Sequence, residues 1–158
     1  MTEEIRIINR FYSSLNKLDA DGMNSCYSEN IIFSDPVFGV LHGKEAKSMW
    51  EMLCYKAEDF SLIFQSPEDK GDGYFTCTWQ AIYRFSKTGK MVTNKGKAFM
   101  KLENGFICEH SDAFSLQRWI SQAFGITGFI LGRIGFFQRK IRNEARAGLE
   151  KWMAKNES

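Results

Sequence analysis

The sequence of 158 residues predicts one α+β domain, in which helices come first and a meander of antiparallel strands follows. Two observations carry this prediction. Apolar residues recur at steps of three and four in the first third of the chain, whereas between residues 61 and 116 they alternate with a period of two. Short glycine-containing polar segments separate the alternating runs, as hairpin turns do.

Three helices are expected before the main run of strands. The first covers residues 3–18, whose apolar residues fall at helical spacing. A short second helix is expected between Asp19 and Tyr27, and a third at about 44–57. Between the last two, residues 31–36 alternate as a strand, which a proline ends before a glycine-containing turn.

Four further strands are predicted after the third helix. Residues 86–90 and 103–105 have the composition of hairpin turns, so consecutive strands should pair antiparallel. The predicted strands are Ser61–Gln65, Gly73–Ser86, Met91–Glu103 and Phe106–Leu116.

The sequence divides into an α+β domain over residues 1–116 and a helical extension over residues 117–158. Residues 123–137 are strongly apolar but too short to span a bilayer. The amphipathic helix that follows has a basic outer face. We expect the extension to pack on the same domain or on a dimer partner. Contact between residues 123–155 and an anionic membrane surface is the alternative.

Composition excludes several function classes. The net charge is only +2, and the basic excess lies in the extension, so a nucleic-acid-binding domain is not expected. The four cysteines are isolated, without the spacing of a zinc site, and the N-terminus lacks the apolar core of a signal peptide. The sequence therefore predicts a cytoplasmic protein with free thiols, without a metal or a cofactor.

Asp35 is the first candidate for chemistry. It continues the inward series of Ile31 and Phe33, and a carboxylate in a dry cavity has a raised pKa and can act as a general base. The alternative is an exposed aspartate that caps the turn at Pro36, because Asp-Pro commonly opens turns.

His110 and Asp112 form the second candidate group. They stand two residues apart on a predicted strand, so both side chains leave the same face of the sheet. On the concave face they could orient or carry a proton beside Asp35. On the convex face they would be exposed to water. The two faces of this strand are similarly apolar, so periodicity leaves the choice open.

Aromatic residues and one amide are candidate walls of a ligand pocket, with core packing as the alternative for most of the rings. The predicted ligand-contacting residues are Phe11, Tyr12, Phe33, Trp50, Trp79, Tyr83 and Asn94.

The segment from Arg10 to Val37 resembles the start of bacterial ketosteroid isomerases. The shared residues are Arg10, Leu15, Asn16, Asp19, Asp21, Gly22 and the run Asp35-Pro36-Val37. The resemblance implies the curved, cone-shaped sheet of the nuclear transport factor 2-like superfamily, with Asp35 as the proton-shuttling base. The His110–Asp112 segment is similar to the last strand of SnoaL-like and epoxide-hydrolase-like relatives.

The departures from the isomerases are equally informative. The tyrosine that stabilises the oxyanion in that family falls on Phe11, and its second aspartate falls near Ala98. Neither residue can donate a hydrogen bond to a developing enolate. Steroid isomerisation is therefore not expected.

These features favour a cofactor-independent acid–base enzyme, of isomerase, hydrolase or cyclase type, that acts on a small apolar molecule. Asp35 would be the base, assisted by His110 and Asp112. The alternative is a non-catalytic module that binds or carries such a molecule. The resemblance implies a homodimer in either case.

Overall fold

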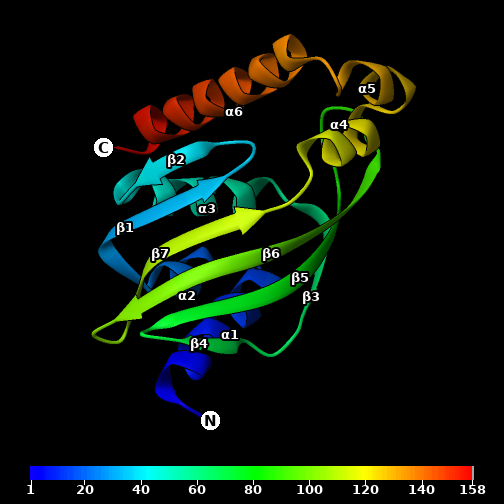
Figure 1. Cartoon of the computed structure of the whole chain (residues 1–158). Helices are drawn as coiled ribbons and strands as arrows, with labels where there is room; N and C mark the ends of the chain where they lie inside the picture. Colours follow the sequence, from blue (N-terminus) through cyan, green and yellow to red (C-terminus); the bar gives the residue numbers. More distant parts are fainter. Residues whose placement is uncertain (158) are drawn as a thin grey trace.

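A computed structural model describes residues 1–157 of the chain and confirms the predicted α+β architecture. Figure 1 shows a curved sheet with α1, α2 and α3 against one face and the long helix α6 across one end. The helices are α1 (Glu3–Asn16), α2 (Ala20–Asn24), α3 (Lys44–Lys56), α4 (Leu116–Phe124), α5 (Ile126–Leu131) and α6 (Gly135–Asn156). The strands are β1 (Tyr27–Asp35), β2 (Gly39–His42), β3 (Glu58–Phe64), β4 (Glu68–Gly71), β5 (Tyr74–Arg84), β6 (Met91–Glu103) and β7 (Phe106–Ala113).

The strands form one mixed sheet in the order β2-β1-β7-β6-β5-β3, and β4 pairs with β5 outside this path. The pair β1–β7 is parallel, whereas the other neighbouring strands are antiparallel. The first strand of the chain therefore lies beside the last strand, and the long connection between them includes α3 and the whole β3–β6 meander.

Strand register decides which side chains face the helices. Phe33 pairs with His110, His110 with Met100, and Met100 with Phe75. All four side chains are buried, so this row crosses the sheet on its inner, concave face. Because side chains alternate along a strand, Asp112 on β7 faces the same interior as His110.

Two short strands were not predicted. The sequence predicts a turn over residues 39–43, but Gly39–His42 forms β2 and pairs antiparallel with β1. The segment Glu68–Gly71 forms β4, although all four residues are exposed and none is apolar. Backbone hydrogen bonds to a neighbouring strand suffice for such edge strands, and an apolar pattern is not needed.

The predicted last strand also ends earlier than expected. It stops at Ala113, because Ser115 caps α4 by accepting a hydrogen bond from the backbone N–H of Arg118 at 3.2 Å.

The C-terminal extension packs on its own domain. The Arg142 Nε donates to the carbonyl of Pro36 at 2.9 Å, and the Arg146 Nη1 donates to that of Phe38 at 2.9 Å. The ring of Trp152 lies 5.3 Å from that of Tyr55 on α3. In the described residues, none of the helices combines the length and the apolar character needed to cross a bilayer.

Shortening a buried side chain of α6 where the helix contacts the domain should destabilise the whole fold. Leu149 is buried, so Leu149→Ala should lower the free energy of unfolding by about 2–4 kcal/mol. The exposed Lys151→Ala on the same helix should change it by less than about 0.5 kcal/mol. Urea unfolding of both variants measures the difference, and a small effect for Leu149→Ala would mean that α6 is not part of the cooperative unit.

Candidate functional site

A mostly apolar cavity of about 340 Å³ lies between the concave face of the sheet and the covering helices. Helix α1 contributes Phe11 and Tyr12, α3 contributes Trp50, and α4 contributes Trp119. This volume is within the lower range of pockets that bind small molecules. Asp35, His110 and Asp112 are all on its wall.

Asp35 both caps the turn at Pro36 and lines the cavity, so the two roles considered for this residue are not exclusive. Its Oδ1 accepts hydrogen bonds from the backbone N–H of Val37 at 2.9 Å and of Phe38 at 2.6 Å. The other carboxylate oxygen takes no part in these bonds. Burial raises the pKa of Asp35 from 3.8 to about 6, although the two backbone donors oppose the shift.

His110 is buried on the concave face and is held by hydrogen bonds at both ring nitrogens. Its Nδ1 lies 2.7 Å from the hydroxyl of Tyr27, and its Nε2 lies 2.9 Å from Oδ1 of Asp112. The Tyr27 hydroxyl in turn accepts a hydrogen bond from Nε1 of Trp50 at 3.0 Å. The imidazole therefore has no free nitrogen to offer a ligand.

The directions of these bonds follow from which groups can only donate. Trp50 can only donate, so the Tyr27 oxygen accepts from it and the tyrosine hydrogen is left for Nδ1 of His110. The proton of a neutral His110 is then on Nε2, where it is donated to Asp112. A chain of donors from Trp50 thus ends on the carboxylate of Asp112.

Asp112 receives a second donor on the same oxygen. Nε1 of Trp79 donates to its Oδ1 at 3.2 Å. The indole lies directly over Gly96, where an added Cβ would come within 2.3 Å of the ring, so only glycine leaves room for it. With Oδ1 occupied twice, the other oxygen of Asp112 is left out of this network.

The register of β1 and β7 brings the two carboxylates together. Phe33 pairs with His110 and Ser34 with Ser111 in parallel strands, and Asp35 and Asp112 are the next residues along the two strands, both on the cavity wall. The charge of Asp112 contributes to the raised pKa of Asp35, and burial remains the larger cause.

Tyr12, one of the predicted ligand-contacting residues, brings a polar group to the cavity wall. The ring lines the cavity and stacks on Phe64 with centroids 5.2 Å apart. Its hydroxyl is buried and has no hydrogen-bond partner within the described part of the chain. An unpaired buried hydroxyl costs about 1–3 kcal/mol, so such a group usually has a ligand or a water as its partner.

The other predicted wall residues separate into two layers. Trp79, Tyr83 and Asn94 line the cavity, as do Phe11 and Trp50, whereas Phe33 does not. Phe33 is fully buried one layer further back, with its ring 5.1 Å from that of His110 and 5.7 Å from that of Trp50. Its ring therefore packs against two residues of the cavity wall and not against the cavity itself.

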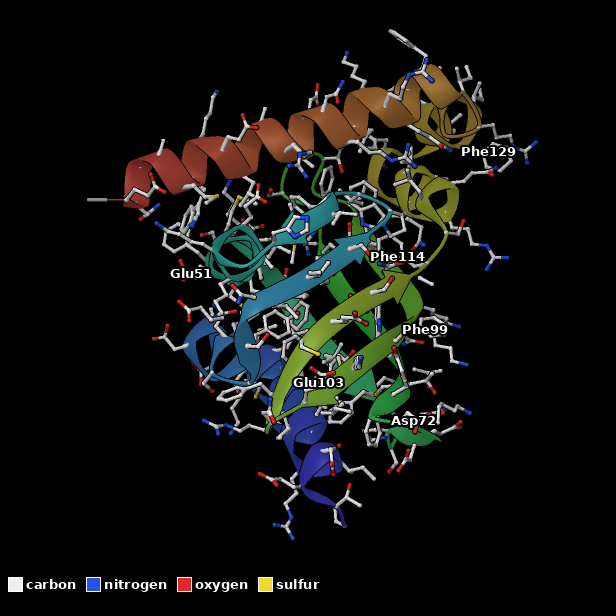
Figure 2. All side chains as sticks on the ribbon, turned by 60° about the vertical axis from the view of Figure 1, so that its left-hand side comes forward. Glu51, Asp72, Phe99, Glu103, Phe114 and Phe129 are labelled. Carbon is white, nitrogen blue, oxygen red and sulfur yellow. The ribbon has the colours of Figure 1, made fainter. Side chains whose placement is uncertain are left out.

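Two wall residues from the C-terminal part of the chain were missed. Phe114 and Trp119 cover one side of the cavity, and Nε1 of Trp119 donates to the hydroxyl of Tyr83 at 2.6 Å. Figure 2 shows Phe114 where β7 leads into α4. Both residues are half-buried, and the amphipathic pattern of α4, which includes only Trp119, does not distinguish a cavity wall from the core.

Comparison with known proteins supports the fold and the family. Residues 8–110 match the SnoaL-like domain family. A comparison with curated proteins finds no match in sequence.

Three solved structures illustrate the shared fold. A nuclear transport factor 2-like protein of unknown function from Burkholderia pseudomallei K96243 is 14% identical, with 78% of this chain and 98% of that chain covered and a TM-score of 0.67. A proposed polyketide cyclase from Silicibacter sp. TM1040 is 17% identical, with 75% and 93% covered and a TM-score of 0.65. An epoxide hydrolase of the LEH-like type from M. tuberculosis is 13% identical, with 82% and 93% covered and a TM-score of 0.65.

At these identities the three structures show a common fold and not a common activity. The curved mixed sheet with its N-terminal helices is the nuclear transport factor 2-like fold that the sequence predicted. The family match spans more than half of the chain, and it includes β1 with Asp35 and most of β7 up to His110. The chain therefore belongs to the SnoaL-like domain family.

Proposed function

We propose that this protein is a cofactor-independent acid–base enzyme, of isomerase, hydrolase or cyclase type, that acts on a small apolar molecule inside the cavity. The observation that carries the proposal is a carboxylate, Asp35, on the wall of a mostly apolar cavity with its pKa raised to about 6. A base is most effective when its pKa is close to the working pH. The polyketide cyclase and epoxide hydrolase folds named above are consistent with this class of chemistry.

In the proposed reaction, Asp35 takes a proton from a carbon acid or from a bound water. Its Oδ1 is fixed by the N–H groups of Val37 and Phe38, so the other oxygen is the one available to the substrate. The protonated Asp35 then returns the proton to the product, and no redox partner is needed. Asp112 lies on the same cavity wall and contributes to the raised pKa of Asp35, and His110 acts as a positioning residue that orients Asp112.

Tyr12 is the proposed donor to the oxygen that becomes negative. Phe11 lacks the hydroxyl that the isomerases use, but the neighbouring Tyr12 lines the same cavity with its hydroxyl unpaired in the described structure. Burial raises the pKa of Tyr12 well above 10, so it remains a protonated donor at neutral pH. A hydrogen bond that strengthens as charge develops is the usual source of such catalysis.

The second candidate is a carrier or sensor that binds an apolar molecule without changing it. The mostly apolar wall, with tryptophans from the sheet, α3 and α4, favours this function as much as it favours an enzyme. A variant that keeps the pocket but lacks the Asp35 carboxylate distinguishes the enzyme from the carrier, because only the enzyme would lose turnover.

Asp35→Asn should keep bound ligand and lose turnover. Asparagine can accept the same backbone hydrogen bonds, so the pocket survives without the base. We expect native mass spectrometry to detect the same small molecule on wild type and variant, and extraction to identify it. Turnover of that molecule should fall at least about 100-fold. In wild type, kcat/KM should rise with pH through about 6 and then level off.

The matched control is Asp21→Asn, an exposed aspartate on α2, which should leave turnover unchanged. Full turnover by Asp35→Asn would exclude the enzyme proposal. Bound ligand without turnover by either wild type or variant would favour the carrier.

The raised pKa of Asp35 should also appear in stability. Because its native pKa of about 6 exceeds the unfolded value of 3.8, the native state holds the proton over that interval. Wild type should therefore lose stability relative to Asp35→Asn as pH rises from about 4 to 7, by about 1–3 kcal/mol. Urea unfolding at several pH values measures the difference, and a difference that does not change with pH would contradict the raised pKa.

Tyr12→Phe should separate stability from activity. Removing an unpaired buried hydroxyl should leave the free energy of unfolding unchanged or slightly higher. If Tyr12 donates to the substrate, kcat should fall about 10²–10³-fold. The matched control is Tyr74→Phe, on an exposed ring of β5, which should change neither quantity. Unchanged kcat in Tyr12→Phe would remove it from the proposed mechanism.

A further inference from the structure

Exposed apolar side chains gather at the helical corner formed by α5 and the start of α6. The apolar tip, as we call it, has side chains that are between 45% and 83% exposed, and it accounts for five of the fifteen exposed large apolar residues among those described. Its members are Ile126, Phe129, Ile130, Ile134 and Phe136. Figure 2 shows Phe129 at the outer edge of the molecule, beyond α4.

The glycines of α5 explain why its bulky face points outward. Gly128 packs against α4 so closely that an added Cβ would come within 2.4 Å of the carbonyl oxygen of Ile120. A Cβ on Gly132 would likewise lie 3.4 Å from the carbonyl of Gln117. Because the glycine side of the helix is used for this contact, Phe129 and Ile130 are left facing solvent.

Only basic charge surrounds the apolar tip along the chain. The sequence from residue 113 to residue 143 contains no aspartate or glutamate. The side chain of Lys90, from the β5–β6 hairpin, lies against Gly125 at the start of α5. The guanidinium of Arg133 lies 5.3 Å from the ring of Phe129. We define the basic rim as the exposed residues Lys90, Arg118, Arg133, Arg139 and Lys140.

We propose that the apolar tip and the basic rim dock this protein onto an anionic membrane surface. Exposed phenylalanine and isoleucine side chains beside lysine and arginine match the two layers of such a surface, which are acyl chains and negative headgroups. The acidic residue nearest along the chain, Glu144, pairs with Lys87 at 3.6 Å, so it does not neutralise the rim.

A second copy of this chain fits the same surface less well. A twofold contact brings each residue near its own copy or its neighbours, so the rim would face another rim of the same sign. Like charges in an interface are costly, whereas an anionic bilayer neutralises them.

The tip also lies close to one side of the ligand cavity. Trp119 on the cavity wall is 5.3 Å from the ring of Phe85, and Phe85 is 5.3 Å from that of Phe124, the last residue of α4. Docking at the tip would therefore hold this side of the cavity near the bilayer, where apolar molecules concentrate. The docking itself does not rest on the proposed enzyme function, since vesicle binding and turnover are measured separately.

Vesicle flotation of the full chain tests the proposal. Wild type should bind vesicles of phosphatidylcholine with about 30% phosphatidylserine at least about tenfold more tightly than pure phosphatidylcholine vesicles, and high salt should weaken the binding. The double variant Phe129→Ser with Ile130→Ser should lose about tenfold or more of this affinity. Arg133→Gln with Lys140→Gln should reduce the preference for phosphatidylserine.

The matched control is Phe99→Ser, which removes a phenylalanine of similar exposure, 47% against 58% for Phe129, from the outer face of the sheet. It should bind vesicles like wild type, and all variants should keep the wild-type circular dichroism spectrum. Absence of wild-type binding would overturn the proposal, as would equal binding by the Phe129/Ile130 variant. A dimer in solution that this variant breaks, without vesicle binding, would assign the tip to a protein interface instead.

Discussion

The parallel pairing of β1 with β7 is the constraint on which the rest of the site depends. It joins segments 77 residues apart, and it sets Phe33 opposite His110 in the only parallel pair of the sheet that residues 1–157 form. From that one register follow the inward direction of His110 and Asp112 and the closeness of Asp35 to Asp112. A shift of one residue would turn Asp112 to the outer face, because side chains alternate along a strand.

The pairing of β1 with β7 also lowers the stability of the folded protein at this site. Two carboxylates beside each other in a mostly apolar cavity lose hydration and repel, and the raised pKa of Asp35 reflects both effects. The surrounding donors limit this cost at defined atoms. Val37 and Phe38 donate to one oxygen of Asp35, whereas His110 and Trp79 donate to one oxygen of Asp112. Each carboxylate keeps one oxygen outside these bonds, so the network stabilises charge without occupying the whole site.

Local pattern was enough to predict most of the fold and the position of Asp35 in it. Helical spacing located α1 and α3, and alternation located the long strands β5 and β6, because each buries one continuous apolar face. Strand β4 was missed because it is stabilised by backbone pairing without a buried side chain, and β2 because its four residues bury only one side chain, Leu41. The direction of His110 could not be read from β7, since its two faces are similarly apolar and only the distant partner strand distinguishes them. Phe33 was predicted to contact a ligand, but it does not line the cavity. The inward direction of a side chain does not show how far that side chain lies from the cavity.

The cavity wall comes partly from residues that match the family and partly from residues beyond the match. Asp35, Tyr12 and His110 lie within the matched residues 8–110, whereas Phe114 and Trp119, which close one side, lie beyond them. Hydrogen bonds tie the C-terminal wall to the sheet, from Nε1 of Trp119 to the hydroxyl of Tyr83 and in both directions between the Gln122 side chain and the Thr93 backbone. Substitutions in α4 can therefore reshape this side of the cavity while Asp35, Tyr12 and His110 keep their positions. The shape of this side of the cavity and the carboxyl group of Asp35 can therefore vary separately, because α4 and β1 are separate stretches of sequence.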